Sequence, residues 1–479
     1  MLTKIRVSSC CIVAIASVCA AGTLLSLTAQ QISSDGTIRQ LLASRVDTIA
    51  GRDDGIGIVV GTISPAGRKI ISYGHSNRST AKSLAGNSIF EIGSVGKVFT
   101  ALLLSEMVQR GEVALNDPVS KYLPEGTKIP AHDGRQITLA DLATHTSGLP
   151  FMPDTYPMIG NPDTYGSRDV YNFLARYQLK SDPGTDWEYS NVDYWLLGQA
   201  LSHRAGMKYD ELLEQRVFRP LKLNGTFSTL PERLKPQVAQ GHDASLQPAL
   251  PFYSLSVYST MGAAAGGVYS SVNDLLDVLS VALGIDNSPL GPSMDAMLRI
   301  RRTIDGRTAQ ALGWVIEAKG NDEYVFHDGG TWGYASAVGW DPKKKIGIVV
   351  LSNQQDSVAD IARHLLRSEL PLEPPKTGRH TEIRIPAAEL EGYAGRYALE
   401  GVGVFQITRE GGSLTLLAPV DWGLPKFRLH PESKDEFFVS EMPMHVTFQT
   451  GDKGNVTGAL IYPPRGQHGI PTTKIKTQP

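Results

Sequence analysis

One apolar segment with a single charge constrains this chain more than any other feature. Residues 92–105 carry one formal charge, Lys97, and form a helical pattern that begins near Ser94 and is apolar nearly all the way round. Such a helix is typical of the interior of a large core. A lone ammonium in the positive first turn of a buried helix is unfavourable unless another group uses or pairs it. Local rules tend to be broken at functional sites, so we expect chemistry here.

Length and composition indicate a folded protein of two or three domains. The chain has 479 residues, of which 41% are apolar and 20% are charged. It is too long for a single core and too apolar for a disordered chain. The net charge is −2 and no basic block occurs. Composition therefore gives no support for nucleic-acid binding.

Residues 1–29 are typical of an export signal. Lys4 and Arg6 precede an uncharged run from Val7 to Ser34, which is the order of regions in a signal peptide. The run is also long enough to be an uncleaved membrane anchor, which is the alternative. We therefore predict an exported protein, periplasmic or secreted, with membrane association through this segment if it stays attached.

Cysteine and histidine usage argues against metal chemistry. All three cysteines, at positions 10, 11 and 19, lie in the leader, so a mature chain that starts after Ala29 has none. Such a chain has no disulfide, thiol nucleophile or cysteine metal site. The histidines show no H-E-x-x-H or other ligand spacing. We expect no metal and no other cofactor.

Hydrophobic periodicity after the leader predicts a domain of mixed helices and strands over residues 30–370. A long loop, 151–168, is of the kind that usually shapes a site. The predicted helical segments are 37–50, the helix from 94, 115–123, 137–149, 169–179, 193–205 and 270–283, with a closing helix at 356–370. The predicted strands are 55–63, 68–76, 313–318, 324–327, 333–340 and 345–352.

A proline-rich linker at 371–380 is the strongest domain boundary, and residues 381–479 then form a separate β-domain. Short alternating runs separated by turn clusters predict a small antiparallel barrel or sandwich. The predicted strands are 403–408, 413–417, 426–429, 436–439, 445–449 and 457–462. Two roles stay open for this domain: it restricts substrate access to a site in the first domain, or it mediates assembly.

Ser94 and Lys97 lie three residues apart and so share one face of their helix. A serine hydroxyl attacks a carbonyl only when a base takes its proton, and a buried lysine can be that base. The backbone N–H groups at the helix start would stabilise the oxyanion that forms. The alternative is a helix-capping serine with a lysine that reaches water, although a capping box would place Glu or Gln where Lys97 stands.

Two later motifs complete a set. Tyr189 and Asn191 follow a turn and open a helix, and their alternative interpretation is a core tyrosine with a capping asparagine. His327-Asp328-Gly329-Gly330 ends one predicted strand and leads towards the next. Its glycines would let a substrate approach the backbone, with the Gly330 N–H as an oxyanion donor. The alternative there is a tight turn with a surface histidine.

The order S-x-x-K, then Y-x-N about 95 residues later, then a strand motif about 135 residues further on resembles the serine β-lactamase and penicillin-binding-protein superfamily. The sequences of residues 90–94, 144–150 and 265–271 are similar to those of the class C-like branch. This branch includes D,D-peptidases, D-aminopeptidases and family VIII esterases. The resemblance spans roughly residues 37–370.

The resemblance implies an α+β fold, with an antiparallel sheet flanked by helices and an all-helical lobe, followed here by the C-terminal β-domain. It implies that Ser94 is acylated, that Lys97 activates it and that Tyr189 shares the proton transfers. Asn191, His327, Gly329 and Gly330 would contact the substrate.

One departure bears on the substrate. Many β-lactamases have Lys-Thr-Gly at the third motif, where this chain has His327-Asp328-Gly329, and the literal Lys376-Thr377-Gly378 lies in the linker. The missing lysine weakens the case for recognising a β-lactam carboxylate. We therefore expect a small-molecule or peptide substrate, first an ester or a D-amino-acid-containing peptide. The alternatives are a β-lactamase and a non-catalytic penicillin or peptidoglycan sensor.

Overall fold

A computed structural model gives the fold of most of the chain after the leader. The predicted leader and most of the linker lie outside the described residues, as does most of the predicted 151–168 loop. The structure describes residues 33–50, 55–77, 82–153, 165–243, 246, 248–249, 261–320, 322–374, 382–399, 403–417, 426–439, 444–451, 454–462 and 470–475.

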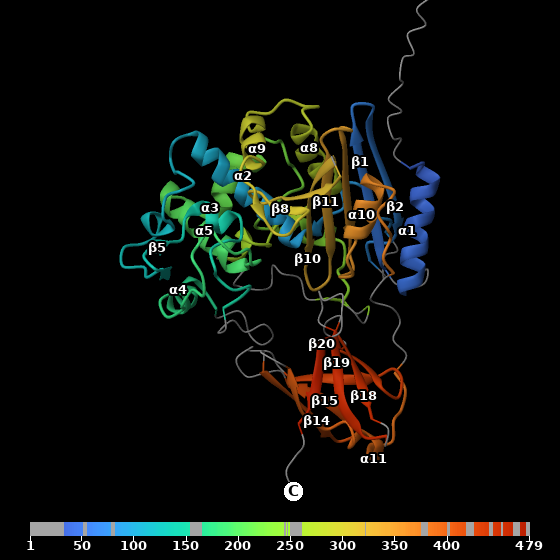
Figure 1. Cartoon of the computed structure of the whole chain (residues 1–479). Helices are drawn as coiled ribbons and strands as arrows, with labels where there is room; N and C mark the ends of the chain where they lie inside the picture. Colours follow the sequence, from blue (N-terminus) through green and yellow to red (C-terminus); the bar gives the residue numbers. More distant parts are fainter. Residues whose placement is uncertain are drawn as a thin grey trace, which may run out of the picture. The chain divides into compact units, whose positions relative to one another are not determined.

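An eight-stranded antiparallel sheet is central to the first part of the chain, in the order β2-β1-β12-β11-β10-β9-β8-β7 (Figure 1). Its strands are β1 (Gly57–Ser64), β2 (Gly67–Gly74), β7 (Arg302–Thr303), β8 (Thr308–Gln310), β9 (Val315–Lys319), β10 (Asp322–Gly330), β11 (Ala335–Asp341) and β12 (Ile346–Ser352). Two small ribbons pair β3 (Phe90–Glu91) with β6 (Tyr269–Ser270), and β4 (Ala131–His132) with β5 (Arg135–Gln136).

The sheet is buried on both faces because its central strands are nearly continuous apolar runs. Alternate residues of β1 enter different cores: Val59 packs into the larger one and Ile58 into the smaller. Helices α1 (Asp35–Ala50) and α10 (Ala359–Leu366) cover the smaller core, and α8 (Val272–Ala282) covers the opposite face. The first residues of the edge strand β2 are exposed. This is the predicted arrangement of a sheet flanked by helices.

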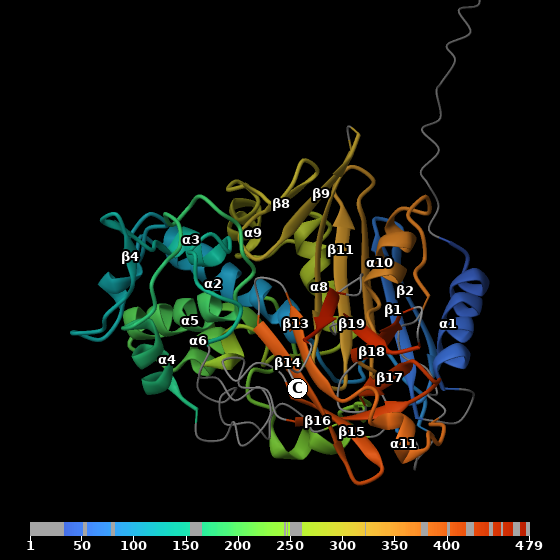
Figure 2. The ribbon, with the colours of Figure 1, turned by 60° about the horizontal axis from the view of Figure 1, so that its bottom comes forward.

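A helical lobe lies beside the sheet, with α2 between them (Figure 1, Figure 2). Its remaining helices contribute to the larger core, which therefore spans both the lobe and one sheet face. The α-helices of this part are α2 (Gly96–Gln109), α3 (Leu139–Ala143), α4 (Ser167–Leu174), α5 (Asn191–Ala205), α6 (Tyr209–Leu213) and α9 (Gly291–Met297). Short 3-10 or π turns are η1 (Gly93–Val95), η2 (Val119–Tyr122), η4 (Glu214–Phe218), η5 (Glu232–Gln237) and η7 (Gly262–Ala264).

Helix α2 is buried as its sequence predicts. All its residues from Gly96 to Met107 are inaccessible to solvent or nearly so. The helix does not begin at Ser94, which lies instead in the 3-10 turn η1, and the residue before α2 is Val95. Ser94 is therefore not a capping residue, and this alternative is wrong.

The predicted helix at 137–149 is shorter in the structure. Thr138 and Asp141 form a reciprocal capping box that starts α3, which ends at Ala143. His145 has a φ of +57°, a left-handed conformation that no α-helix continues through. Residues after Ala143 consequently form a loop rather than a second helical turn.

The C-terminal part is a closed barrel rather than a sandwich. The predicted strands are present, and two further ones, β13 and β20, pair with each other to close the ring. The interior is filled by apolar side chains such as Tyr397, Phe427 and Phe437. Its strands are β13 (Gly395–Leu399), β14 (Gly403–Glu410), β15 (Ser413–Leu417), β16 (Lys426–Pro431), β17 (Glu436–Val439), β18 (Met444–Thr450), β19 (Val456–Tyr462) and β20 (Ile470–Lys474), preceded by α11 (Ala387–Leu390).

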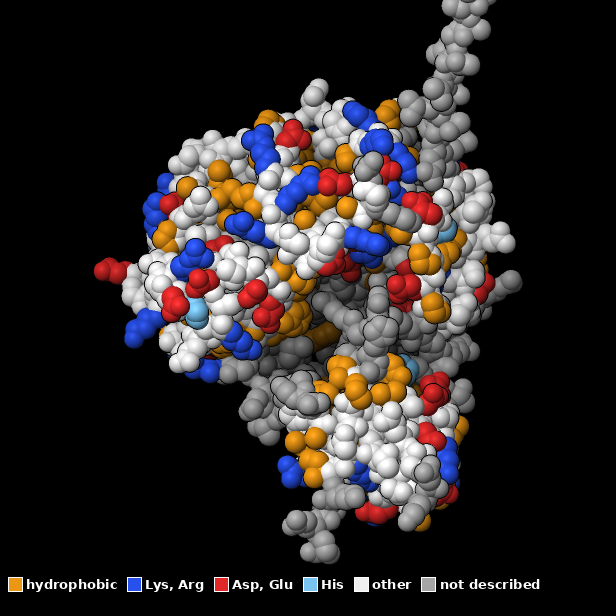
Figure 3. Space-filling view, in the orientation of Figure 1, with side chains coloured by type: hydrophobic (Ala, Val, Ile, Leu, Met, Phe, Trp, Pro, Cys, Tyr) orange, Lys and Arg blue, Asp and Glu red, His pale blue; other side chains and the backbone are white. Residues whose placement is uncertain are grey.

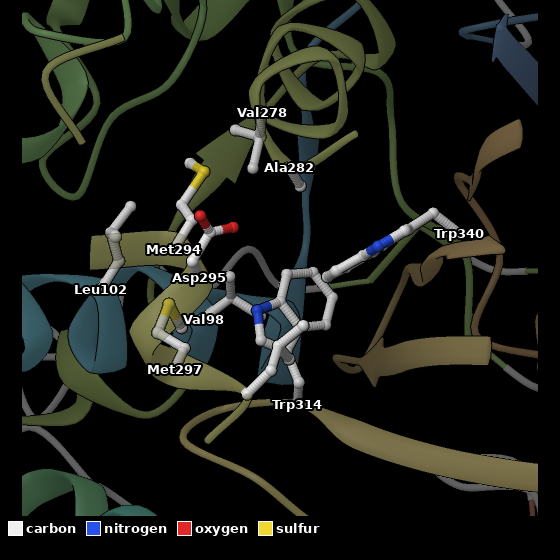
Figure 4. Close-up of a pocket in the computed structure, with 10 residues that line it drawn as sticks. Val98, Leu102, Val278, Ala282, Met294, Asp295, Met297, Trp314 and Trp340 are labelled. Carbon is white, nitrogen blue, oxygen red and sulfur yellow. The ribbon is translucent and has the colours of Figure 1, made fainter. Parts of the chain in front are cut away.

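Neither the surface charge nor the internal cavity beside α2 marks a site. Acidic and basic side chains are interspersed over residues 33–374 on the face shown in Figure 3. A cavity of about 20 Å³ is lined by Asp295 and otherwise by apolar side chains, including the edge-to-face pair Trp314 and Trp340 (Figure 4). It has room for about one water molecule. Neither Ser94 nor Lys97 lines it.

Candidate active site

The turn that carries Ser94 is pressed against the end of strand β10. Gly93 has a φ of +49°, and a Cβ on it would lie 2.8 Å from the backbone N of Gly330. A Cβ on Gly329 would lie 2.2 Å from the carbonyl O of Ile92 and 2.8 Å from the N of Ser94. Only glycine permits this approach. It brings the backbone N–H groups of Ser94 and Gly330 into one contact region.

Lys97 is 0% exposed and does not reach solvent, so the alternative of a lysine that extends to water is wrong. Its Nζ lies 3.3 Å from Ser94 Oγ, and Ser94 is itself 9% exposed. Nζ also donates to Asn191 Oδ1 and to the carbonyl O of Ala265, at 2.7 Å each. Both of these oxygens can only accept hydrogen bonds. The amine is thus held by Asn191 and Ala265 at a short distance from Ser94.

Tyr189 and Asn191 lie at the start of α5 and adjoin the lysine. Lys97 Nζ is 4.9 Å from the centroid of the Tyr189 ring. The capping residue of α5 is Ser190, whose Oγ accepts from the N–H of Asp193, so Asn191 is not the cap. Its amide is instead fixed by Lys97. The structure thus brings the first two predicted motifs together.

The predicted third motif is the end of β10 and not a turn. His327 is buried, and its Nδ1 is 2.7 Å from the carbonyl O of Asp328. It alternates with Val325 and Gly329 on the sheet face that meets the larger core, whereas Asp328 is exposed on the other face. Position 327 therefore carries no lysine ammonium. Gly329 and Gly330 have no side chains, so they can contact a substrate only through their backbone atoms.

A buried polar pair beside Tyr189 was not predicted from the sequence. His145 Nδ1 lies 3.3 Å from Asp193 Oδ2, and Ser147 Oγ donates to the other carboxyl oxygen. Burial, followed by the nearby Lys97 and His327, holds the pKa of His145 well below its usual range. Burial also raises the pKa of Asp193 well above its usual range. The sequence does place His145 and Ser147 two residues apart, which could have indicated a polar cluster. Nothing in the sequence indicates that these residues contact position 193.

The raised pKa of Asp193 gives a testable pH dependence of stability. Its carboxyl keeps a proton in the folded state at pH values where the unfolded chain, with an ordinary pKa of 3.8, has lost it. Its contribution to stability therefore falls as pH rises above 3.8, until the raised folded pKa is passed. Asp193→Asn imitates the neutral acid and does not titrate. The free energy of unfolding of the variant minus that of wild type should rise with pH by at most about 1.4 kcal/mol per unit.

Denaturant unfolding of both proteins at pH 5, 6, 7 and 8 measures this difference. Asp182→Asn, which alters a half-exposed carboxyl paired with His132 and Arg135, is the matched control. A difference that is constant or that falls with pH would show that Asp193 is ionised in the folded protein.

One group of side chains has the proximity that a metal requires. Among the described residues, the ligand atoms of His132, Asp133 and Asp182 lie within 4.8 Å of one another. His132 Nδ1 is 2.7 Å from Asp182 Oδ1, and Arg135 lies 3.6 Å from the same carboxylate. The group is thus already internally paired. It involves none of the residues around Ser94.

Comparison with known proteins agrees with this geometry. The family profile described as "Beta-lactamase" matches residues 39–370, and that of a domain of unknown function, DUF3471, matches residues 379–473. A β-lactamase of Pseudomonas fluorescens is 28% identical over 352 residues, covering 66% of this chain and 94% of the relative. The D-alanyl-D-alanine-carboxypeptidase/endopeptidase AmpH of Escherichia coli K12 is 27% identical, covering 72% and 94%. Penicillin-binding protein 4* of Bacillus subtilis is 25% identical, covering 80% and 87%.

Solved structures show the same fold. A β-lactamase/D-alanine carboxypeptidase from Yersinia pestis superposes with a TM-score of 0.59 at 24% identity, covering 70% of this chain and 97% of that one. A class C β-lactamase gives a TM-score of 0.60 at 21% identity, covering 70% and 95%. The predicted fold class is confirmed. With its family profile matched over most of its length and a serine, a lysine and a tyrosine gathered at one site, the chain belongs to the β-lactamase family of serine hydrolases.

Proposed function

We propose that this protein is an exported hydrolase that forms an acyl-enzyme on Ser94 and cleaves esters or D-amino-acid-containing peptides and amides. The contact of 3.3 Å between the buried Lys97 Nζ and Ser94 Oγ carries the proposal. The same amine donates to Asn191 Oδ1 and to the Ala265 carbonyl O. A neutral Lys97 in this position has its nitrogen within reach of the serine hydroxyl, as a general base requires.

In the acylation step, Lys97 takes the Ser94 proton while Oγ bonds to the substrate carbonyl carbon. The N–H groups of Ser94 and Gly330 stabilise the oxyanion. Tyr189 gives its proton to the leaving group as the scissile bond breaks, and takes up the proton that Lys97 removed from Ser94. In deacylation, Tyr189 and Lys97 take a proton from water as its oxygen bonds to the acyl carbon. The bond from the acyl carbon to Ser94 Oγ then breaks, and that proton is returned to Oγ. Asn191 keeps the amine oriented and contacts the substrate amide.

Side chains around Tyr189 favour apolar leaving groups. Phe151 is 38% exposed and its ring stacks on that of Tyr189, with centroids 6.2 Å apart. The Trp187 ring is tilted relative to the Tyr189 ring, with centroids 6.5 Å apart. Esters and apolar peptides could pack their leaving groups against these aromatic rings. β-Lactam hydrolysis ranks after esterase and peptidase activity because His327 replaces the lysine of many β-lactamases, although several relatives carry that name. A non-catalytic penicillin or peptidoglycan sensor is the remaining alternative.

The proposal of export rests on the leader sequence. Lys4 and Arg6 before an apolar run are the signal, and an uncleaved leader would tether the enzyme to a membrane. Within the described ranges, the structure has no helix of the length and hydropathy needed to cross a bilayer. The substrate is a small molecule or a peptide, and no nucleic-acid partner is proposed.

A substrate panel tests the proposal. Nitrophenyl esters, D-aminoacyl amides and nitrocefin are compared with the same enzyme preparation, and a fluorescent penicillin and a fluorophosphonate serve as covalent probes. We expect turnover of the esters or D-aminoacyl amides to exceed that of nitrocefin. Fast nitrocefin turnover would make the protein a β-lactamase. Penicillin labelling without turnover of any substrate would support the sensor.

A further inference from the structure

The loop that follows α3 contains a histidine in an unusual backbone conformation. His145 is 1% exposed, and its φ of +57° lies in the left-handed region, which residues other than glycine seldom adopt. Backbone strain of this kind persists where surrounding contacts impose it and is concentrated at functional sites. The proposed chemistry uses Ser94, Lys97 and Tyr189 and assigns His145 no part.

His145 accepts hydrogen bonds from both neighbours of Tyr189. The N–H of Glu188 donates to the His145 carbonyl O at 2.9 Å, and the N–H of Ser190 donates to Nδ1 at 3.2 Å. One residue thus fixes the backbone on each side of the tyrosine. The next bonds in the series are Ser190 Oγ to the Pro150 carbonyl O at 2.7 Å, and Asn191 N to the Phe151 carbonyl O at 3.0 Å.

The imidazole also packs directly on the tyrosine. Its centroid is 4.4 Å from that of Tyr189 and 5.2 Å from that of Tyr194. Tyr194 is in turn anchored because its hydroxyl donates to the Ala143 carbonyl O at 2.9 Å. Lys97 Nζ lies near both rings, at 4.9 and 5.5 Å from their centroids. His145 and Lys97 therefore both lie against the rings of Tyr189 and Tyr194.

The hydrogen bonds assign the tautomer of the ring. Because the Ser190 N–H donates to Nδ1, the lone pair is on Nδ1 and the proton is on Nε2. Nε2 is buried and has no hydrogen-bond partner among the residues that the structure describes. Asp193 Oδ2 lies 3.3 Å from the same nitrogen, and with the lone pair on Nδ1 the carboxyl group is the donor of this contact. A neutral imidazole adds no cation of its own beside Lys97.

We propose that His145 is a positioning residue for Tyr189, holding the tyrosine at the distance from Lys97 and Ser94 that proton transfer requires. The inference rests on the proposed function, in which Tyr189 moves the proton of the leaving group. A displacement of about 1 Å at a reacting group can cost about 10²-fold in rate. The loss of His145 should therefore reduce kcat and leave KM nearly unchanged, since the substrate-contacting groups stay in place.

Three variants separate the two contacts that His145 makes. His145→Asn keeps a side-chain acceptor for the Ser190 N–H and tolerates a positive φ. His145→Phe keeps a ring against Tyr189 and has no acceptor. His145→Ala has neither. We expect kcat to fall by about 10²-fold in His145→Ala and to be largely rescued in His145→Asn, with His145→Phe close to alanine. His132→Asn, which changes a half-exposed histidine of β4, is the matched control.

Rescue by phenylalanine and not by asparagine would overturn the proposal, because the ring would then only fill space. An alanine variant with the kcat of wild type would overturn it as well. Where alanine does not fold, the comparison of asparagine with phenylalanine decides.

A second measurement separates this inference from the proposed function. Tyr189→Phe and the double variant Tyr189→Phe, His145→Ala are compared. If His145 acts through Tyr189, the double variant is no slower than Tyr189→Phe alone. Two slow single variants whose effects multiply would overturn the positioning role. A Tyr189→Phe enzyme as fast as wild type would instead overturn the role of Tyr189 in the proposed function.

Discussion

Ser94→Ala is expected to lose about 10⁶-fold in kcat on every substrate that the wild-type enzyme turns over, as removal of the nucleophile does in other serine hydrolases. The fold should be retained because the Ser94 side chain caps no helix. Its contact is with the Lys97 amine, and alanine fits in the same turn. The measurement is steady-state turnover, with far-ultraviolet circular dichroism and thermal unfolding recorded on the same sample.

Ser105→Ala is the matched control. Ser105 is also buried on helix α2, and its Oγ donates to the Ser293 carbonyl O at 2.8 Å. It lies outside the proposed machinery, so this variant should lose some stability and keep its kcat. Turnover by Ser94→Ala at the wild-type rate would remove Ser94 from the mechanism.

Lys97→Met is expected to slow acylation of Ser94 by about 10³-fold, within the range that general bases contribute. Methionine has a similar length and fills the buried site without a charge. Lys97→Arg should be nearly as slow, because a guanidinium keeps the charge and the donors but does not give up its proton in proteins. The rate of fluorophosphonate labelling measures the attack of Ser94 Oγ on phosphorus, with loss of fluoride, and does not depend on the true substrate.

The arginine variant distinguishes two roles for the lysine. If Lys97→Arg labels at the wild-type rate while Lys97→Met does not, the lysine acts as a fixed positive charge and not as the base. Lys69→Met, at an exposed lysine of β2 that pairs with Asp35, is the control for a general effect of removing a charge. It should label at the rate of wild type.

Strong periodicity made much of the fold predictable. The hairpin of β1 and β2 and the strands β9 to β12 follow from segments rich in β-branched and aromatic residues with turns between them. The two strands that close the barrel were not predicted. β13 has only five residues. β20 contains Pro471, which has no N–H to donate and so argues against a strand when the local sequence is considered alone. Their pairing is between residues about 75 positions apart, so it depends on tertiary structure that local patterns do not report.

The residues of the candidate site that stand in short sequence motifs could be predicted. Contacts between loops that are distant in the sequence could not. Ser94, Lys97 and Tyr189 stand in recognisable motifs, and the burial of Lys97 follows from its apolar helix. Ala265 was not predicted because its contribution is a backbone carbonyl, which any residue has. The pairing of His145 with Asp193 brings together positions 48 residues apart. It also depends on the left-handed backbone conformation of His145, which local sequence does not indicate.

The most direct test of the central claim is the location of a covalent adduct. Wild-type enzyme is treated with a fluorophosphonate, digested and analysed by peptide mass spectrometry. We expect one phosphonyl group per chain, on the peptide that contains Ser94, and none on Ser94→Ala. An adduct on any other residue, or no adduct under conditions in which a control serine hydrolase is fully labelled, would contradict the assignment of Ser94 as the nucleophile.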